Sequence, residues 1–108
     1  MLHGFGGPVE LLEDFGRMGL YFSFGGLLSN PAASRCQGAA AAVKTSRLLL
    51  ESDCPDHPPR LSGEAQSQPA HLRFTLARLA EVRGQSEDSL AKACSANARK
   101  LFGLSKPA

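Results

Sequence analysis

Hydrophobic and polar positions in the first quarter of the chain predict one helix followed by one short strand. The helix is expected to begin near Pro8, because the first helical turn does not need the N–H group that proline lacks. Apolar residues then recur on one helical face: Leu11, Leu12, Phe15 and Met18. Gly19 is expected to end this helix, and the aromatic-rich segment 20–24 predicts a strand.

A second helix and a second strand are predicted within residues 30–51. Asn30 is expected to cap the helix and Pro31 to take its first position. The alanines at 39–42 favour helix to about Val43, and their small side chains suit close packing on a sheet. The segment 47–51 then predicts a strand that is buried on both faces, because its centre is a continuous apolar run.

The last half of the chain predicts a long loop followed by two helices. Residues 54–69 are rich in Pro, Ser, Gln and Gly, and a loop of that length inside a compact domain is usually functional or mobile. One helix is expected over 70–83, ended by Gly84, and another between a Ser86 cap and Gly103. The predicted buried face of the last helix consists of Leu90, Ala93, Cys94, Asn97, Ala98, Leu101 and Phe102.

Strands that alternate with helices in this way predict an α/β fold built from parallel βαβ units. At 108 residues the chain is expected to form one domain at most. Its hydrophobic content of 43% and charged content of 20% are ordinary for a globular protein and argue against wholesale disorder.

Charge, cysteine usage and hydropathy narrow the class of protein further. The net charge of +2 is small, and Lys and Arg are scattered, so no stripe that would track phosphates is predicted. Three widely spaced cysteines indicate reduced thiols more than a disulfide framework. No apolar run approaches the roughly 20 residues of a membrane span, and no secretory signal is visible. We therefore expect an intracellular protein, cytoplasmic or nuclear, with no membrane partner.

Two carboxylates directly follow the second predicted strand. Glu51 and Asp53 are two residues apart, so an extended backbone would direct both to the same side. Carboxylates at the end of a buried strand are costly to bury unless they bind a metal ion or a proton. In a parallel α/β fold, active sites are built at this end of the strands. The segment therefore predicts a polar functional site.

Four sequence blocks resemble the TatD family of metal-dependent hydrolases, which are deoxyribonucleases or phosphodiesterases on a (β/α)8 barrel. The block Leu2-His3-Gly4-Phe5-Gly6-Gly7 is similar to the family's His-x-Phe-Ser-Gly turn. Gly19-Leu20-Tyr21-Phe22-Ser23-Phe24-Gly25-Gly26 is similar to its Gly-x-Tyr-x-Ser-x-x-Gly strand. Leu48-Leu49-Leu50-Glu51-Ser52-Asp53-Cys54-Pro55 is similar to Leu-Leu-x-Glu-Thr-Asp-x-Pro, and Asn97-Ala98-Arg99-Lys100-Leu101-Phe102 to the closing Asn-Ala-x-x-Leu-Phe. Because the four blocks keep the family's order over nearly the whole chain, the chain is identified as a member.

The resemblance implies the C-terminal part of such a barrel. A complete barrel needs about 250 residues, and the match begins near the end of strand six and runs through strand eight. The expected fold is therefore a partial TIM-type (β/α)8 barrel, roughly strands 6–8 with their helices. Residues 1–104 are expected to form this portion and residues 105–108 a tail. The family's opening His-x-His pair, its middle glutamate and the histidine after it have no counterpart in the sequence.

The resemblance also implies a divalent metal ion (Zn²⁺, Mn²⁺ or Mg²⁺) held by His3 and Asp53. Asp53 is the implied catalytic residue, because it would also orient the attacking water. Glu51 is implied to support these ligands, or alternatively to pair with an arginine. Without the resemblance, His3 would be an exposed histidine near the N-terminus and Asp53 a loop cap before Pro55.

Other positions carry weaker predictions. Cys54, Asp56 and His57 are also metal-capable, but their spacing matches no standard zinc pattern. The segment Ser67-Gln68-Pro69 stands where the family usually has Asn-Glu-Pro. Asn97 lies on an apolar helix face, where a buried amide must find partners, so it is expected to tie the last helix to a barrel loop. Two aromatic residues are expected to pack in the core rather than stack on a base: Tyr21 and Phe24.

The implied function is metal-dependent hydrolysis of ester bonds, as a deoxyribonuclease that cleaves DNA phosphodiesters with metal-activated water. Its partner would be DNA or another phosphodiester. The alternative is a catalytically inactive shortened form or pseudoenzyme that acts as an interaction module. Two ligands do not fix a metal for hydrolysis, and unpaired strand edges invite association. The chain by itself is therefore expected to be inactive.

Overall fold

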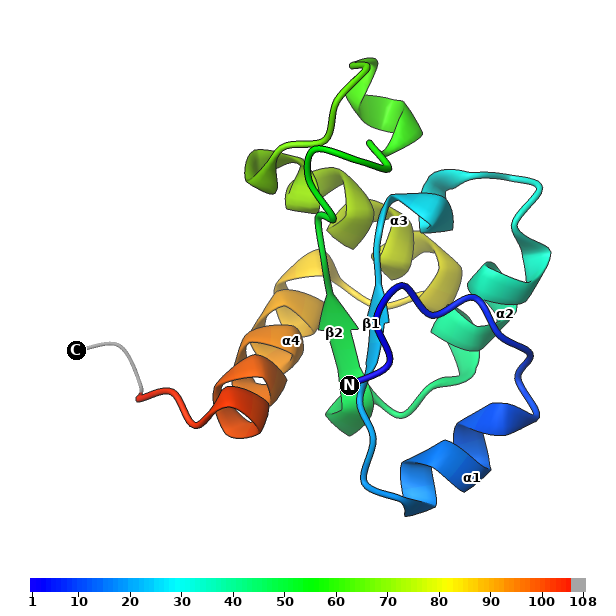
Figure 1. The fold of residues 1–108 in the computed structure, drawn as a ribbon, viewed down its shortest axis with the longest axis vertical. Coiled ribbons are helices and arrows are strands. Elements are labelled where there is room, and N and C mark those ends of the chain that lie inside the picture. Colours follow the sequence, from blue (N-terminus) through cyan, green and yellow to red (C-terminus); the bar gives the residue numbers. More distant parts are fainter. Residues whose placement is uncertain (106–108) are drawn as a thin grey trace.

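The computed structural model describes residues 1–105 and shows a two-stranded parallel sheet surrounded by helices (Figure 1). The helices and strands follow in the order α1 (Leu11–Arg17), β1 (Phe22–Phe24), α2 (Ser34–Ala42), β2 (Leu48–Leu50), α3 (Leu72–Arg83) and α4 (Glu87–Phe102). Short 3₁₀ helices occupy Gly26–Ser29, Thr45–Arg47, Arg60–Ser62 and Pro69–His71. The predicted alternation of helices and strands is confirmed. Most of the predicted tail, residues 106–108, lies outside the described part of the chain.

The two strands pair in parallel, as the sequence predicted. Phe22 lies opposite Leu48, and Phe24 opposite Leu50. The other side of β1 carries an isolated parallel bridge to Leu2, whose N–H donates to the Tyr21 carbonyl at 2.8 Å. Because α2 links β1 to β2, the predicted βαβ unit is confirmed. Residues 1–105 contain two strands and this bridge, so the partial barrel remains a prediction.

Both strands and the first two helices are shorter than the sequence predicted. α1 begins at Leu11, not at Pro8, whose carbonyl instead accepts a hydrogen bond from the Leu11 N–H at 3.2 Å. α2 begins at Ser34, so the predicted helix start at Asn30 is wrong. Asn30 ends the preceding 3₁₀ helix in an extended conformation, and its side chain accepts from the Ala32 N–H at 3.0 Å. The chain therefore needs a turn there before it can re-enter a helix.

The two last helices follow the prediction closely. α3 is followed by Gly84 and α4 by Gly103, both in the left-handed conformation that favours glycine. Ser86 caps α4, since its hydroxyl accepts a hydrogen bond from the Ser89 N–H at 3.1 Å. The prediction that Phe102 belongs to the buried face of α4 is wrong, because this residue is 59% exposed.

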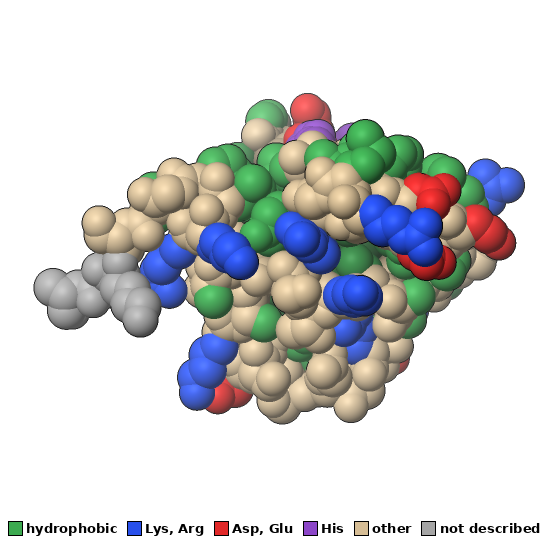
Figure 2. All heavy atoms as spheres, turned by 90° about the horizontal axis from the view of Figure 1, so that it is seen from below, with side chains coloured by type: hydrophobic (Ala, Val, Ile, Leu, Met, Phe, Trp, Pro, Cys, Tyr) green, Lys and Arg blue, Asp and Glu red, His purple; other side chains and the backbone are tan. Residues whose placement is uncertain are grey.

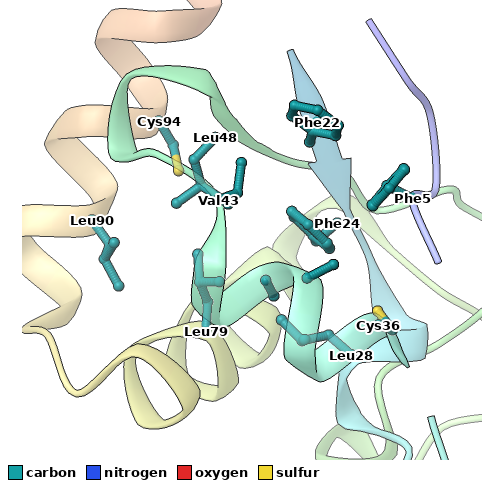
Figure 3. Close-up of a cluster of buried hydrophobic side chains, with 12 residues drawn as sticks. Phe5, Phe22, Phe24, Leu28, Cys36, Val43, Leu48, Leu79, Leu90 and Cys94 are labelled. Carbon is teal, nitrogen blue, oxygen red and sulfur yellow. The ribbon is translucent and has the colours of Figure 1, made fainter. Parts of the chain in front are cut away.

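The core lies between the sheet and α2, α3 and α4 (Figure 3). Phe5, from the N-terminal segment, meets Phe22 and Phe24 edge-on, with ring centroids 5.0 and 6.1 Å apart. Leu79 of α3 and Leu90 of α4 are fully buried in the same cluster. Tyr21 and Phe24 are both buried, which confirms that they pack in the core.

Two polar side chains fix the backbone between the end of α2 and the start of β2. The Asn97 amide donates to the carbonyls of Thr45 and Leu48 at 2.7 and 2.8 Å, which confirms its predicted structural role. Arg83 donates to the carbonyls of Ala40 and Val43 at 2.8 and 2.7 Å. The last carbonyls of a helix have no partner within it, so Arg83 satisfies the C-terminus of α2 from α3.

Candidate metal site at the carboxyl ends of the strands

The predicted site residues follow backbone segments that run in parallel. His3 comes directly after the bridge residue Leu2, and the Phe5 N–H donates to the Ser23 carbonyl of β1 at 2.8 Å. Glu51 comes directly after β2, and its N–H donates to the Phe24 carbonyl at 2.9 Å. Because parallel segments end on the same side of a sheet, residues separated by about half the chain meet at one rim.

The structure brings His3, Glu51 and Asp53 together. The His3 Nε2 atom lies 3.2 Å from Glu51 Oε2 and 3.5 Å from Asp53 Oδ1. The His3 side chain is 59% exposed, that of Asp53 33%, and that of Glu51 only 13%. The imidazole therefore lies at the mouth of the site, with the Glu51 carboxylate deepest.

Glycines make the space that Glu51 occupies. A Cβ atom on Gly4 would lie 3.2 Å from Glu51 Oε1, and one on Gly25 would lie 3.1 Å from Glu51 Cγ. Oε2 is buried, and no group among the described residues donates a hydrogen bond to it, although His3 Nε2 lies 3.2 Å away. The ion pairs of residues 1–105 include no arginine partner for Glu51. A buried carboxylate oxygen without a hydrogen bond is costly, which favours a cation at this point.

Asp53 reaches the site through a turn rather than through strand alternation. β2 ends at Leu50, and Asp53 has a φ of 51°, in the left-handed region that Asp adopts more readily than most residues. The turn continues to Asp56, whose N–H donates to the Asp53 carbonyl at 2.9 Å. Both carboxylates thus face the same side, as predicted. The cause is the turn at Asp53 and not the extended backbone that the prediction assumed.

His57 is a fourth polar residue at the site, and the motifs did not include it. Its Nε2 lies 3.5 Å from Asp53 Oδ2, while His3 faces the other oxygen, Oδ1. A cavity of about 310 Å³ is lined by His3, Gly4, Phe5, Gly25, Gly26, Leu27, Cys36, Glu51, Asp53 and His57. The sequence signal that could have identified His57 is its place four residues after Asp53 in the loop at the rim.

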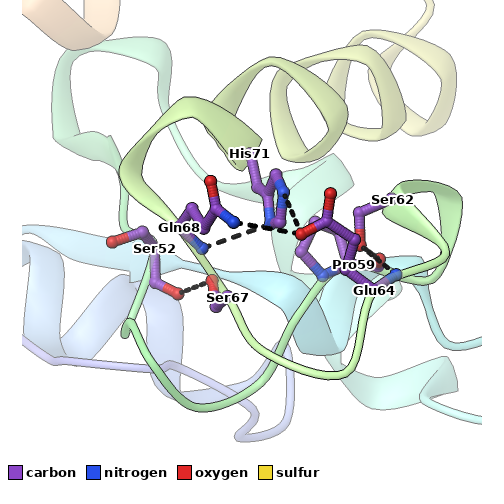
Figure 4. Close-up of polar contacts among 7 residues, drawn as sticks. All are labelled: Ser52, Pro59, Ser62, Glu64, Ser67, Gln68 and His71. Carbon is purple, nitrogen blue, oxygen red and sulfur yellow. Dashed lines mark hydrogen bonds and ion pairs between the residues drawn. The ribbon is translucent and has the colours of Figure 1, made fainter.

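The loop behind the site is held by polar contacts (Figure 4). The Ser67 hydroxyl donates to the Ser52 carbonyl at 2.8 Å, and the Ser67 N–H donates to the Pro55 carbonyl at 2.9 Å. The Gln68 N–H donates to His71 Nδ1 at 3.2 Å, and the Gln68 amide to Glu64 at 3.1 Å. The segment that differs from the family's Asn-Glu-Pro therefore supports the backbone on either side of Asp53.

The donor chemistry of the site fits a divalent metal ion in part. Imidazole and carboxylate together suit zinc or manganese. Adjacent ligands of a tetrahedral zinc with bonds of 2.0–2.1 Å lie about 3.4 Å apart, close to the observed separations of 3.2 and 3.5 Å. Within residues 1–105, however, no three His, Cys, Asp or Glu side chains converge on one point that could hold a metal. The chain supplies suitable pairs of donors rather than a closed coordination sphere.

The cysteines near the site are not arranged as metal thiolates. Cys36 lines the cavity, but burial raises the pKa of its thiol, which keeps it neutral. Cys54 is exposed, and all three cysteines are free.

The distribution of basic side chains and the lengths of the helices bear on other kinds of binding partner. Lys and Arg side chains are spread in separate spots over the face in Figure 2, rather than joined into one patch. In the described part of the chain, every helix is too short or too polar to cross a membrane.

Comparisons with known proteins extend over the same residues. The family model for TatD related DNase matches residues 1–103. The uncharacterized metal-dependent hydrolase YabD of Bacillus subtilis is 26% identical, over 96% of this chain and 41% of its own length. The 3′-5′ ssDNA/RNA exonuclease TatD of Citrobacter rodentium is 34% identical, again over 96% of this chain and 41% of its own.

A solved structure shows the same backbone arrangement. The crystal structure of YjjV, a TatD homologue from Escherichia coli, superposes with a TM-score of 0.84 and 32% identity, over 95% of this chain and 40% of that one. The chain thus spans about 40% of the length of the relatives it matches. Since the family model covers nearly all of the chain and includes the site, this protein belongs to the TatD family of metal-dependent hydrolases.

Proposed function

We propose that this chain carries part of the active site of a metal-dependent hydrolase that cleaves phosphodiester bonds in nucleic acid, most directly DNA. The observation that carries the proposal is the grouping of His3, Glu51 and Asp53 at the carboxyl ends of parallel segments. The name of the Citrobacter relative, an ssDNA/RNA exonuclease, supports the choice of nucleic acid as substrate. The free cysteines support an intracellular location, cytoplasmic or nuclear.

His3 and Asp53 would hold the metal, which when bound supplies Lewis acidity and lowers the pKa of a bound water. Asp53 is 33% exposed and can accept a hydrogen bond from that water, which would orient it for attack. Glu51 lies deeper and would fix the orientation of the His3 imidazole through the contact of 3.2 Å. The glycines at positions 4 and 25 leave the space in which its carboxylate sits.

Two ligands and a supporting carboxylate do not close a coordination sphere, so a barrel's remaining strands would have to supply further donors. A partial TIM-type barrel, roughly strands 6–8, is the architecture we propose for the chain. Its parallel sheet and its superposition on 40% of the YjjV chain support this assignment.

A chimera tests the proposal. Residues 1–103 would replace the matching part of the Citrobacter exonuclease TatD, with the parent as the positive control and the Asp53→Asn chimera as the matched negative. Cleavage of a labelled single-stranded DNA in Mg²⁺ or Mn²⁺ is the assay. We expect cleavage by the chimera that EDTA and Asp53→Asn abolish, and no cleavage by the chain alone.

A folded chimera that binds metal but cleaves no phosphodiester would overturn the proposal. That result would leave the interaction module without catalysis as the better account of the chain.

A further inference from the structure

The loop that follows β2 places a second imidazole at the metal site. The Nε2 atoms of His3 and His57 lie on opposite oxygens of Asp53, each at 3.5 Å. Both histidines line the same cavity as Glu51. His57 lies outside the four sequence blocks that carry the resemblance, so none of their residues accounts for it.

The backbone that carries His57 is built into the rim of the site. A Cβ atom on Gly26 would lie 2.0 Å from the His57 carbonyl oxygen, so only glycine at position 26 lets the loop lie where it does. His57 has a φ of 49°, a left-handed conformation that costs free energy for most residues but less for His. Because this close contact holds the backbone of the loop, the position of the His57 Cα atom relative to Asp53 is fixed.

The side chain is free to reach a metal. It is 69% exposed, so a change of rotamer would displace only solvent. Its separation of 3.5 Å from Asp53 Oδ2 is close to the roughly 3.4 Å between adjacent ligands of a tetrahedral zinc. Within residues 1–105 no three donors converge as they stand, His57 included, so its side chain would have to turn toward the metal on binding. A second imidazole beside His3 would then add a third ligand to the pair formed by His3 and Asp53.

We propose that His57 is an additional metal-binding residue of this site, which joins His3 and Asp53 when a divalent ion is present. This inference rests on the proposed function, because it takes the metal to lie beside Asp53. It differs from the local zinc site considered from the sequence, since it uses His57 with His3 and Asp53 and does not involve Cys54 or Asp56.

Titration of the purified full chain with Co²⁺, followed by its visible d–d absorption, tests the inference without requiring catalysis. His57→Asn removes the imidazole and keeps a residue that tolerates left-handed backbone. Asp56→Asn is the matched control, because it changes a neighbouring residue of the same loop that does not line the cavity. We expect His57→Asn to weaken Co²⁺ binding by about tenfold or more, since even residues that only support metal ligands act on that scale. Asp56→Asn should bind as the wild type does.

A second variant distinguishes a ligand from a residue that merely pairs with Asp53. In a Cys54→Ser background, the remaining thiols are the buried Cys36 and Cys94. His57→Cys in that background should give a new thiolate-to-Co²⁺ charge-transfer band in the near ultraviolet. A structural role for His57 would produce no such band.

Each result has a distinct meaning. Co²⁺ binding that is equal in wild type and His57→Asn, or no new band in His57→Cys, would overturn the role of His57 and leave the proposed function standing. No Co²⁺ binding by the wild type would also overturn the role of His57, because that role requires His3, Asp53 and His57 to bind the ion within this chain; the proposed function would then be decided by the chimera. Weakened binding in His57→Asn together with the new band would establish His57 as a ligand.

Discussion

The buried amide of Asn97 gives the sharpest test of how β2 is held. The substitution Asn97→Asp keeps the shape of the side chain and removes its two N–H donors. In the native protein these donors meet the carbonyls of Thr45 and Leu48 at 2.7 and 2.8 Å, and Asn97 is only 9% exposed. The change therefore removes both hydrogen bonds and turns a carboxylate oxygen toward two carbonyl oxygens.

The magnitude follows from these contacts. Two lost hydrogen bonds contribute about 1 kcal/mol each, and a buried group left without a partner adds about 1–3 kcal/mol. We therefore expect Asn97→Asp to lower the free energy of unfolding by about 3–5 kcal/mol, a large share of the roughly 5–15 kcal/mol typical of a domain. Burial beside carbonyls would raise the pKa of the introduced carboxyl group above its unfolded value. The deficit should consequently be largest near neutral pH and shrink as the pH falls and the carboxyl group gains a proton.

Urea unfolding followed by circular dichroism, at neutral and at acidic pH, measures both effects. Asn30→Asp is the matched control, because the Asn30 oxygen accepts its hydrogen bond from Ala32 and a carboxylate oxygen can do the same. Should Asn97→Asp unfold within about 0.5 kcal/mol of the wild type at neutral pH, the assigned role of Asn97 is wrong.

Four further predictions concern the loop at Gly26, the exposed thiol of Cys54, the buried thiol of Cys94 and the contact of Arg83 with α2. Gly26→Ala should lower stability by about 2 kcal/mol or more in urea unfolding, because its Cβ would meet the His57 carbonyl; an unchanged midpoint would refute this. Cys54 alone should react with a thiol reagent in the native protein at pH 7.5, since the other two cysteines are buried. Burial raises the pKa of Cys94 to about 11, so stability should fall as the pH rises from about 9 toward 11, and Cys94→Ala should flatten that fall. Arg83→Met should cost about 2–4 kcal/mol, because it leaves two carbonyls unpaired, whereas the exposed Arg35→Met should cost little.

Local signals along the chain predicted those elements whose ends depend on their own residues. The Ser86 cap and the glycines after α3 and α4 act within one helical turn, so they could be recognised from the sequence. Asn30 shows the limit of such signals. Its side chain does make a local turn, but this turn follows the 3₁₀ helix Gly26–Ser29 and does not begin α2, which starts four residues later at Ser34.

The site shows the same division between local and tertiary causes. The resemblance to the TatD family implied that His3, Glu51 and Asp53 would lie together, and in the structure they meet at one rim because parallel segments end together. For His57 the sequence offered only its place four residues after Asp53, because its position also depends on the left-handed turn at Asp53 and on the absence of a side chain at Gly26. The contact with Gly26 is tertiary, and it leaves no recognisable pattern near His57 in the sequence.

The most direct test of the metal site is calorimetric titration of the purified chain with Zn²⁺ and with Mn²⁺. Wild type, His3→Ala and Asp53→Asn would be compared, with Asp56→Asn as the control for a lost carboxylate in the same loop. We predict binding by the wild type that the first two variants each weaken by about tenfold or more and the control leaves unchanged. No binding by the folded wild type, or equal binding by all four proteins, would contradict the assignment of His3 and Asp53 as metal ligands.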